Sequence, residues 1–343
     1  MPDLAPGPAE GQEPLPAPSS SSEPSRNRPN IGRAILRYLT WTPALVPAAI
    51  VAAIIWQLLA ASGFSLVPFH GPTNFGWGFF SSTWQPHASP PQWGIMVFIV
   101  GSFLTALPAL LFSMAIGLGI AIASTTYLPR IMTRFLDPFV DLLAGIPSVV
   151  YGIWAYLAIA PYFGTELNPW LYRHVGFIPG FGAPAPLAIG IGLPISIFIL
   201  TLMALPITTL LIRDALRSVP KDLWESGLAL GATRWETLRR VAIPHSSRGI
   251  LSAAFLGFGR AFSETIALAL LLGVVASYPA SFYGETATLA TVMLQNLDAA
   301  YGNSQWLAAL SEMALVLLAV SLIVNILGRR LVSTFVAYDV AGL

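Results

Sequence analysis

The stretch GILSAAFLGFGRAFSETIALALLLGVV, Gly249 to Val275, is apolar except for two charged residues near its middle. Eleven uncharged residues precede Arg260 and eleven follow Glu264. A run of roughly 20 apolar residues is long enough to cross about 30 Å of hydrocarbon as a helix. The stretch therefore predicts a transmembrane helix that carries an arginine and a glutamate close to the bilayer midplane, where charge is costly.

The composition of the whole chain agrees with this prediction. The chain has 343 residues, of which 55% are hydrophobic and only 10% are charged, whereas about a quarter of the residues of a soluble domain are charged. This composition is typical of an integral membrane protein. A net charge of +1 gives no reason to expect a nucleic-acid partner, and the absence of cysteine excludes disulfides and thiolate metal sites. The four histidines lack metal-ligand spacing, so we expect no metal: His70, His87, His174 and His245.

Six apolar segments are long enough to span a bilayer, which predicts an all-α membrane fold with six transmembrane helices. These segments are 43–62, 94–124, 137–161, 185–212, 249–275 and 306–328. Pro108 predicts a kink or tilt in the second segment. Residues 1–30 are rich in Pro, Ser and Glu and are expected to form a disordered cytoplasmic tail. The first segment could be a cleavable signal sequence, but its length favours an uncleaved anchor.

The basic residues predict the orientation of these helices, because cytoplasmic loops carry an excess of Lys and Arg. With six spans and both termini in the cytoplasm, all but two of the 17 basic residues lie inside. The exceptions are Arg173, in an outer loop, and Arg260, within a span. The outer loop 276–305 contains TATLATVMLQNL, which predicts a short amphipathic helix. Packing of this helix against the bundle is favoured over docking of a partner.

The cytoplasmic loop 213–247 predicts two short helices. Residues 221–230 and 233–242 both have apolar sides, and Gly231 between them is suited to a left-handed helix end. We expect Pro244 to break the chain before the fifth span. Two amphipathic helices on a cytoplasmic surface need either lipid headgroups or a soluble partner to cover their apolar sides.

This loop resembles the EAA loop of ABC importer permeases. The resemblance rests on the order Glu225-Ser226-Gly227, then Gly231, then Val241-Ala242-Ile243-Pro244. Small residues replace the two alanines of the motif. In that family the loop forms the coupling helix, which sits in a cleft of the ATPase subunit. The resemblance implies that a partner ATPase contacts Glu225, Leu228, Gly231, Ala232, Trp235 and Pro244.

Two further stretches, AGIPSVVYG (Ala144 to Gly152) and LGFGRAFSET (Leu256 to Thr265), narrow the family. They are similar to the permease subunits of the phosphate-specific ABC importer, and the outer loops and C-terminal stretch resemble its PstC type. The resemblance implies a type I (MetI-like) permease domain over 93–335, after a first transmembrane helix and outer loop at 31–92. Ser263 stands where the family usually has glycine.

The same resemblance implies partners and a location. The expected partners are a second, PstA-like permease, a PstB-like ATPase dimer, an extracytoplasmic PstS-like phosphate-binding protein and membrane lipid. The expected location is the cytoplasmic (inner) membrane of a prokaryote. The chain itself would bind no cofactor, since ATP and Mg²⁺ would be held by the ATPase.

Arg260 and Glu264 are four residues apart, so on a continuous helix they share one face, about 6 Å apart along the axis. They could form an ion pair that joins helices, but the favoured interpretation is that they line a substrate path. Arginine is a planar, multi-donor cation suited to phosphate. Our hypothesis is that Glu264 accepts a hydrogen bond from a protonated phosphate oxygen and neutralises Arg260 when the path is empty.

Hydroxyl groups of Ser263, Thr265 and Ser148 are further candidate donors to the anion. Ser148 follows Pro147, whose ring frees a backbone carbonyl. The Ser148 hydroxyl could equally bond back along its own helix.

The remaining acidic residues favour simpler interpretations. Asp137 and Asp141 begin the third predicted span, and Glu312 lies near the start of the last. Stabilisation of helix N-termini is favoured for all three over a role in transport.

No sequence motif predicts catalysis by this chain. The single lysine, Lys221, follows proline, so there is no phosphate-binding P-loop. We therefore expect a transport permease and not an enzyme. The alternatives are a permease for another oxyanion (sulfate, molybdate or phosphonate) and a membrane-embedded enzyme, which would need paired acids or a Ser/His pair within the spans.

Overall fold

The computed structural model describes residues 31–62, 79–182 and 189–341, and the chain divides into two compact units after Ile54. Helix α1 (Ile31–Ala61) begins in the first unit, and its stretch Leu45–Ala61 is apolar. The first predicted span, 43–62, is thus confirmed as helical. The predictions for residues 1–30 and for most of the first outer loop lie outside the described residues.

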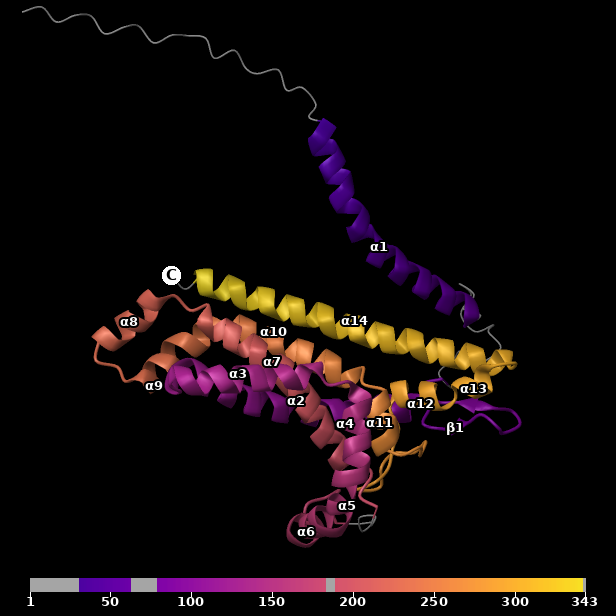
Figure 1. Ribbon diagram of the computed structural model, residues 1–343. Helices are drawn as coiled ribbons and strands as arrows, with labels where there is room; N and C mark the ends of the chain where they lie inside the picture. Colours follow the sequence, from indigo (N-terminus) through magenta and orange to yellow (C-terminus); the bar gives the residue numbers. More distant parts are fainter. Residues whose placement is uncertain (1–30, 63–78, 183–188, 342–343) are drawn as a thin grey trace, which may run out of the picture. The chain divides into compact units, whose positions relative to one another are not determined.

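The second unit is almost entirely helical (Figure 1). Its only described strands, β1 (Trp84–Gln85) and β2 (Gln92–Trp93), form a short antiparallel pair. The α-helices are α2 (Met96–Ile122), α3 (Arg130–Gly145), α4 (Ser148–Trp154), α5 (Ala160–Tyr162), α6 (Asn168–Val175), α7 (Leu193–Arg217), α8 (Lys221–Ala229), α9 (Arg234–Thr237), α10 (Ile243–Phe262), α11 (Ile266–Leu271), α12 (Leu289–Gln295), α13 (Leu297–Ala300) and α14 (Ser304–Ala341).

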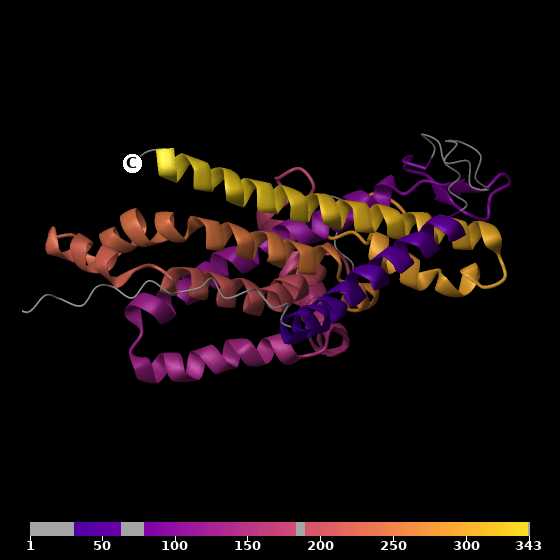
Figure 2. The same ribbon diagram turned by 90° about the horizontal axis from the view of Figure 1, so that it is seen from above.

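Helices α2, α7, α10 and α14 form the bundle of this unit, and α7 is the most buried of them. Small polar residues let α2 and α7 approach closely, as expected between membrane helices. Thr208 donates from Oγ1 to the Ser113 carbonyl oxygen at 3.3 Å, and a Cβ on Gly117 would lie only 3.0 Å from Thr208 Oγ1. Figures 1 and 2 show α8 and α9 at one end of this bundle and α12, α13 and the strands at the other.

In the residues that the structure describes, four wide turns of π-helix interrupt or end the regular helices, and each precedes a proline. They are η1 (Ala123–Tyr127), η2 (Ala155–Ile159), η3 (Phe163–Leu167) and η4 (Leu238–Ala242). In each case one residue lies between the turn and the proline. The backbone N–H of this intervening residue bonds to the carbonyl five residues before it. A proline ring collides with the carbonyl four residues back, and widening the turn relieves that collision.

The wide turn η4 corrects one prediction. Pro244 does not break the chain before the fifth span, because the N–H of Ile243 bonds to the Leu238 carbonyl and the backbone stays helical. Arg234 to Phe262 is one continuous helical segment. The cytoplasmic loop is therefore joined to α10 without a flexible link.

Three helices in the described residues are long and apolar enough to cross a membrane, and a fourth span is possible if one bent pair counts as one. The three are Met96–Tyr127, Leu193–Arg217 and Ser304–Gly328, which agree with the second, fourth and sixth predicted spans. The predicted count of six spans stays a prediction.

Two of the predicted spans are not continuous helices. Span 137–161 is bent by 93° between Gly145 and Ser148, where Pro147 cannot continue the helix. Span 249–275 is interrupted between Phe262 and Ile266.

The short helix predicted in the outer loop 276–305 is present as α12. Leu289 and Val292 are buried in a cluster with Phe98 of α2 and Trp306 of α14. The helix begins at Thr288, whose hydroxyl accepts a hydrogen bond from the Thr291 N–H. Packing against the bundle, the favoured interpretation, is confirmed for this helix.

Candidate functional site

The fifth predicted span breaks at the two candidate charges. Helix α10 ends at Phe262, and the next helical residue is Ile266. The Ser263 hydroxyl donates to the Gly259 carbonyl at 2.8 Å, and the Thr265 hydroxyl donates to the Ser263 carbonyl at 3.3 Å. Such local side-chain bonds offer the backbone an alternative to helix. Both hydroxyl protons are used within the break, so these two residues are poorly placed as anion donors.

Arg260 lies before this break, and Glu264 lies within it. The prediction that they share one continuous helix face is wrong, and no ion pair joins them in the described part of the chain. Arg260 lies in the last turn of α10 with an exposed side chain, while Glu264 is half-buried. The helix C-terminus favours a positive charge. Arg260 therefore remains available to a ligand.

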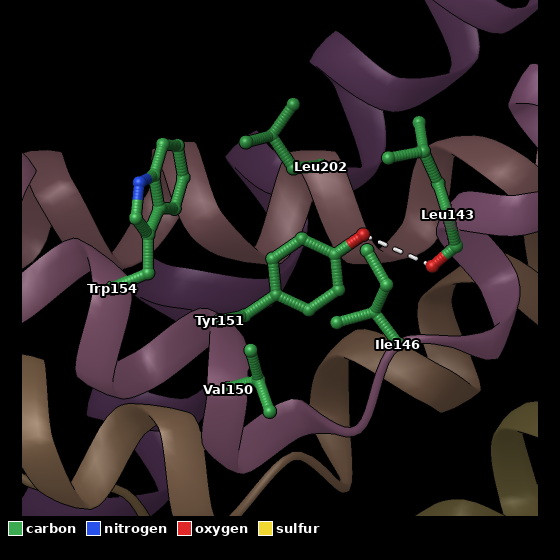
Figure 3. Close-up of a pocket in the computed structure, with 6 residues that line it drawn as sticks. All are labelled: Leu143, Ile146, Val150, Tyr151, Trp154 and Leu202. Atoms are coloured by element: carbon green, nitrogen blue, oxygen red, sulfur yellow. Dashed lines mark hydrogen bonds between the residues drawn. The ribbon is translucent and has the colours of Figure 1, made fainter.

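A tyrosine side chain forms a hydrogen bond across the bend between α3 and α4. Pro147 has no N–H, so the Leu143 carbonyl four residues back loses its helical partner. The Tyr151 hydroxyl donates to that carbonyl oxygen at 2.9 Å (Figure 3). Sequence reasoning placed Ser148 at this position and missed Tyr151. A polar aromatic residue one turn after a proline is the signal that could have found it.

Helix α4 brings the Tyr151 segment next to the break at Arg260. A Cβ on Gly152 would lie 3.0 Å from both Ala267 Cα and Leu270 Cδ1, so α4 and α11 touch at this glycine. Two sequence motifs about 110 residues apart thus meet at one place. Ser148 is half-buried at the start of α4.

A pocket of about 260 Å³ opens at the same bend (Figure 3). The figure shows the Tyr151 hydroxyl turned toward Leu143, with apolar side chains around the ring. Its lining residues are Leu143, Ile146, Val150, Tyr151, Trp154 and Leu202. Because the lining is apolar, this pocket does not hold the anion. The same apolar side chains shield the hydrogen bond between Tyr151 and Leu143 from competing water.

The coupling loop folds as its sequence predicts. Helix α8 ends in a Schellman motif, in which the Gly231 N–H bonds to the Leu228 carbonyl and the Ala232 N–H to the Gly227 carbonyl. Gly231 has φ +83°, the left-handed conformation expected of it. A Cβ on Gly227 would lie 2.8 Å from Thr237 Cγ2, so α8 and α9 pack closely where the family motif has its second small residue.

The end of this loop presents an exposed apolar surface. Leu228, Leu230 and Trp235 are 43%, 89% and 51% exposed. Of the other predicted coupling residues, Glu225, Gly231 and Pro244 are exposed and Ala232 is half-buried. Exposed apolar patches of this kind mark interaction sites. The residues expected to contact an ATPase are thus at least partly accessible.

A capping box begins α9 beside this surface. The Thr233 hydroxyl accepts from the Glu236 N–H, and the Glu236 carboxylate accepts from the Thr233 N–H and hydroxyl at 2.8 and 2.9 Å. These hydrogen bonds lower the pKa of Glu236. The box stabilises the start of α9.

A charge cluster joins α3 to α7. Arg213, whose side chain is only 5% exposed, places Nη1 2.7 Å from Asp137 Oδ1 and Nη2 3.4 Å from Asp141 Oδ1. Arg217 Nη2 lies 3.0 Å from Asp137 Oδ2. The prediction that the two aspartates stabilise a helix N-terminus is wrong, because α3 begins at Arg130 and both lie inside it. Matching four-residue spacings, Asp137/Asp141 and Arg213/Arg217, were the missed signal.

Glu312 also lies away from a helix start. Helix α14 begins at Ser304, and the Glu312 side chain is buried within the bundle. The expectation that it stabilises a helix N-terminus is therefore wrong as well.

With this geometry established, comparison with known proteins gives the family. Residues 115–335 match the model of the binding-protein-dependent transport system inner membrane component. The chain belongs to this family. It is 32% identical over 320 residues to the phosphate transport system permease protein PstC of Mesorhizobium japonicum, covering 93% of this chain and 95% of that protein. It is 32% identical to PstC of Haemophilus influenzae, covering 86% and 94%.

Solved structures of the same fold agree with this family. A bacterial ABC transporter for import of the acidic polysaccharide alginate matches with a TM-score of 0.58 at 17% identity, covering 88% of this chain and 97% of that one. The MetNI methionine ABC transporter matches with a TM-score of 0.51 at 20% identity, covering 72% and 99%. The fold is thus that of a MetI-like ABC importer permease. The chain is a multi-pass membrane protein and a transport permease, not an enzyme.

Proposed function

We propose that the chain is the PstC-type permease subunit of an ATP-driven importer of inorganic phosphate in a prokaryotic cytoplasmic membrane. The relatives that match most of its length are named phosphate transport system permeases. The observation in the chain itself that supports phosphate is Arg260, an exposed guanidinium at a helix break inside an otherwise apolar segment.

Arg260 has the right chemistry for a tetrahedral oxyanion. Its planar guanidinium presents five N–H donors in a fixed fork, which matches two oxygens of one phosphate. Glu264 follows four residues later, within the break. A phosphate that keeps one proton at neutral pH can donate a hydrogen bond through that proton to the Glu264 carboxylate, while sulfate has no proton to donate. The pair would thereby favour phosphate over sulfate.

Glu264 does not neutralise Arg260 in this structure, since no ion pair joins the two. The proposed role of Glu264 is therefore to accept a hydrogen bond from the protonated phosphate, without serving as a resting partner of Arg260. Ser148 is a further hydroxyl donor in this proposal, because it lies half-buried at the start of the same α4 that carries Tyr151.

The expected partners follow from the exposed surfaces. The apolar end of α8 and α9, with Leu228 and Trp235, would dock in a PstB-like ATPase dimer that holds ATP and Mg²⁺. A second, PstA-like permease would complete the path around Arg260. A PstS-like binding protein would deliver phosphate at the opposite end, near α12 and α13 (Figure 1). Closure of the ATPase would move α8 and switch the path between its outward-open and inward-open states.

Uptake of labelled phosphate into vesicles that contain the assembled complex tests this function. Sulfate, molybdate and phosphonate serve as competitors, and Arg260→Gln is compared with Arg130→Gln, an exposed arginine at the start of α3. We expect uptake that resists the competitors and falls about 10- to 100-fold in Arg260→Gln only, the value of one charge-assisted contact. Preferred uptake of a competitor would instead assign the chain to another oxyanion.

A further inference from the structure

The end of α7 is packed against the coupling helix. Trp224 of α8 lies against a buried cluster that contains Leu216 and Val219, at and just beyond the end of α7, and Leu238 of η4. Helix α8 starts at Lys221, four residues after α7 ends at Arg217. A displacement of α8 therefore displaces the end of α7, because packed interiors are nearly incompressible.

The same end of α7 holds α3 through charge. Arg213 and Arg217 both contact Asp137, at 2.7 and 3.0 Å, and Arg213 also reaches Asp141. Arg213 is buried, so the ion pair is little screened by solvent. An apolar contact would serve plain stability at least as well as a buried ion pair. A charged contact, however, fixes one register between two helices.

Helix α3 in turn holds α4 at the 93° bend. Asp137 and Leu143 are six residues apart on α3, about 9 Å along a rigid helix. The Tyr151 hydroxyl bonds to the carbonyl of Leu143 across the bend. Without this bond the Leu143 carbonyl would have no hydrogen-bond partner in an apolar pocket. An unpaired polar group in apolar surroundings costs free energy. The bond therefore ties the direction of α4 to that of α3.

Helix α4 ends this series of contacts at the proposed anion path. Gly152 touches Ala267 of α11, the helix that begins directly after the break that follows Arg260 on α10. Each step is a contact between different helices or across the bend. Together the contacts connect α8 to the helix that follows the break containing Glu264.

We propose that Arg213, Asp137 and Tyr151 are positioning residues that transmit movement of the coupling helix α8, by way of α3, to the Arg260 segment. We name this series of contacts the α3 route: Trp224 to the cluster that contains Leu216, Arg213 to Asp137, Leu143 to Tyr151, and Gly152 to Ala267 just beyond the Arg260 break. The inference rests on the proposed function for the role of Arg260. The α3 route assigns a role in transmitting movement to the bend at Pro147 and to the charge cluster around Arg213. The proposed anion path alone does not explain either feature.

Removal of one hydroxyl tests the α3 route with little risk to folding. Tyr151→Phe keeps the ring and deletes only the bond to Leu143, while Tyr156→Phe is the matched control, because Tyr156 is exposed in η2 next along the same helical segment. Both variants are studied in the full complex in liposomes, with ATP hydrolysis and phosphate uptake measured together. We expect Tyr151→Phe to keep binding-protein-stimulated ATP hydrolysis and to lose phosphate moved per ATP by at least about fivefold, the lower end of usual coupling between sites.

A double variant tests whether the contacts act in series. Asp137→Asn interrupts the route at the charge cluster, and Asp141→Asn is its control, since Asp141 is 53% exposed and more distant from Arg213. If Asp137 and Tyr151 belong to one route, the double variant Asp137→Asn/Tyr151→Phe loses no more phosphate per ATP than the worse single variant. Full additivity of the two losses would overturn the route.

A distance measurement reports the movement directly. The chain has no cysteine, so spin labels can be attached at Leu157→Cys and Leu322→Cys, both on exposed positions, with partner subunits free of reactive cysteines. We expect the distance between the labels to change when ATP binds, and this change to shrink in Tyr151→Phe but not in Tyr156→Phe.

The outcomes separate this inference from the proposed function. An unchanged transport ratio and an unchanged distance response in Tyr151→Phe would refute the α3 route. Loss of ATP hydrolysis and of assembly together would also refute it, because the hydroxyl would then serve folding. If the wild-type complex moves no phosphate but the label distance still depends on Tyr151, the phosphate assignment fails and the α3 route stands.

Discussion

Arg213 Nη1 lies 2.7 Å from Asp137 Oδ1, and this largely buried contact joins α3 to α7 through two residues that are more than 70 positions apart in sequence. Burial makes the pair costly to break from one side only. Arg217 supplies a second contact to the same carboxylate. Asp137 therefore accepts from two cations at once, and its loss leaves the buried Arg213 with only the weaker contact to Asp141.

Asp137→Asn is expected to destabilise the protein by about 3 kcal/mol, the cost of leaving a buried charge without its main partner. Asp141→Asn should cost less than about 1 kcal/mol, because that carboxylate is 53% exposed and 3.4 Å from Arg213. Thermal unfolding of the detergent-purified protein, followed by tryptophan fluorescence, compares the two. Equal losses would mean that the cluster is not organised around Asp137.

Gly152→Ala is expected to destabilise the contact between α4 and α11. The added methyl group would lie 3.0 Å from the Ala267 backbone, which cannot move as a flexible side chain can. Overpacking of this kind costs about 1–3 kcal/mol. Gly119→Ala is the control, since nothing lies within 4 Å of its new methyl group and a mid-helix alanine is favoured over glycine. The unfolding midpoint should fall in Gly152→Ala and stay or rise in Gly119→Ala.

Gly231→Val is expected to disturb the coupling surface through its backbone alone. The glycine has φ +83°, and no atom lies near enough for a new side chain to collide with it. A β-branched residue in this conformation costs about 1–3 kcal/mol, whereas asparagine tolerates it. Co-purification of the ATPase with the permease should weaken in Gly231→Val and be nearly normal in Gly231→Asn. Equal binding by both variants would mean that the turn between α8 and α9 is not needed for docking.

Glu236 makes the stability of the coupling loop dependent on pH. Its pKa in the folded protein is lowered from 4.5 by hydrogen bonds from the Thr233 backbone N–H and hydroxyl. A lowered pKa contributes stability above the unfolded value, and that contribution is lost as the pH falls from about 4.5 through the folded pKa. The unfolding midpoint of wild type should thus exceed that of Glu236→Gln at pH 7, and the difference should shrink below pH 4.5. A difference that does not vary with pH would argue against the capping contact.

The sequence determined the class of this protein and its cytoplasmic loop. Long uncharged runs have no stable place outside a membrane, so composition alone indicated the bilayer. The Schellman end at Gly231 and the short helix α8 were predictable because such motifs depend on residues within one or two turns of each other. The motif order from Glu225 to Pro244 was enough to suggest the family.

The tertiary structure alone decided the geometry of the site. Hydropathy describes segments and not their direction, so it could not foresee the 93° bend after Gly145 or the break after Phe262. Nor could spacing reveal that Asp137 faces Arg213 or that Tyr151 bonds to the carbonyl freed by Pro147. These contacts join residues from different helices or across a bend, and their free energy depends on packing that no local stretch encodes. Local chemistry thus determined what the chain is, while long-range packing decided where Arg260 lies and what surrounds it.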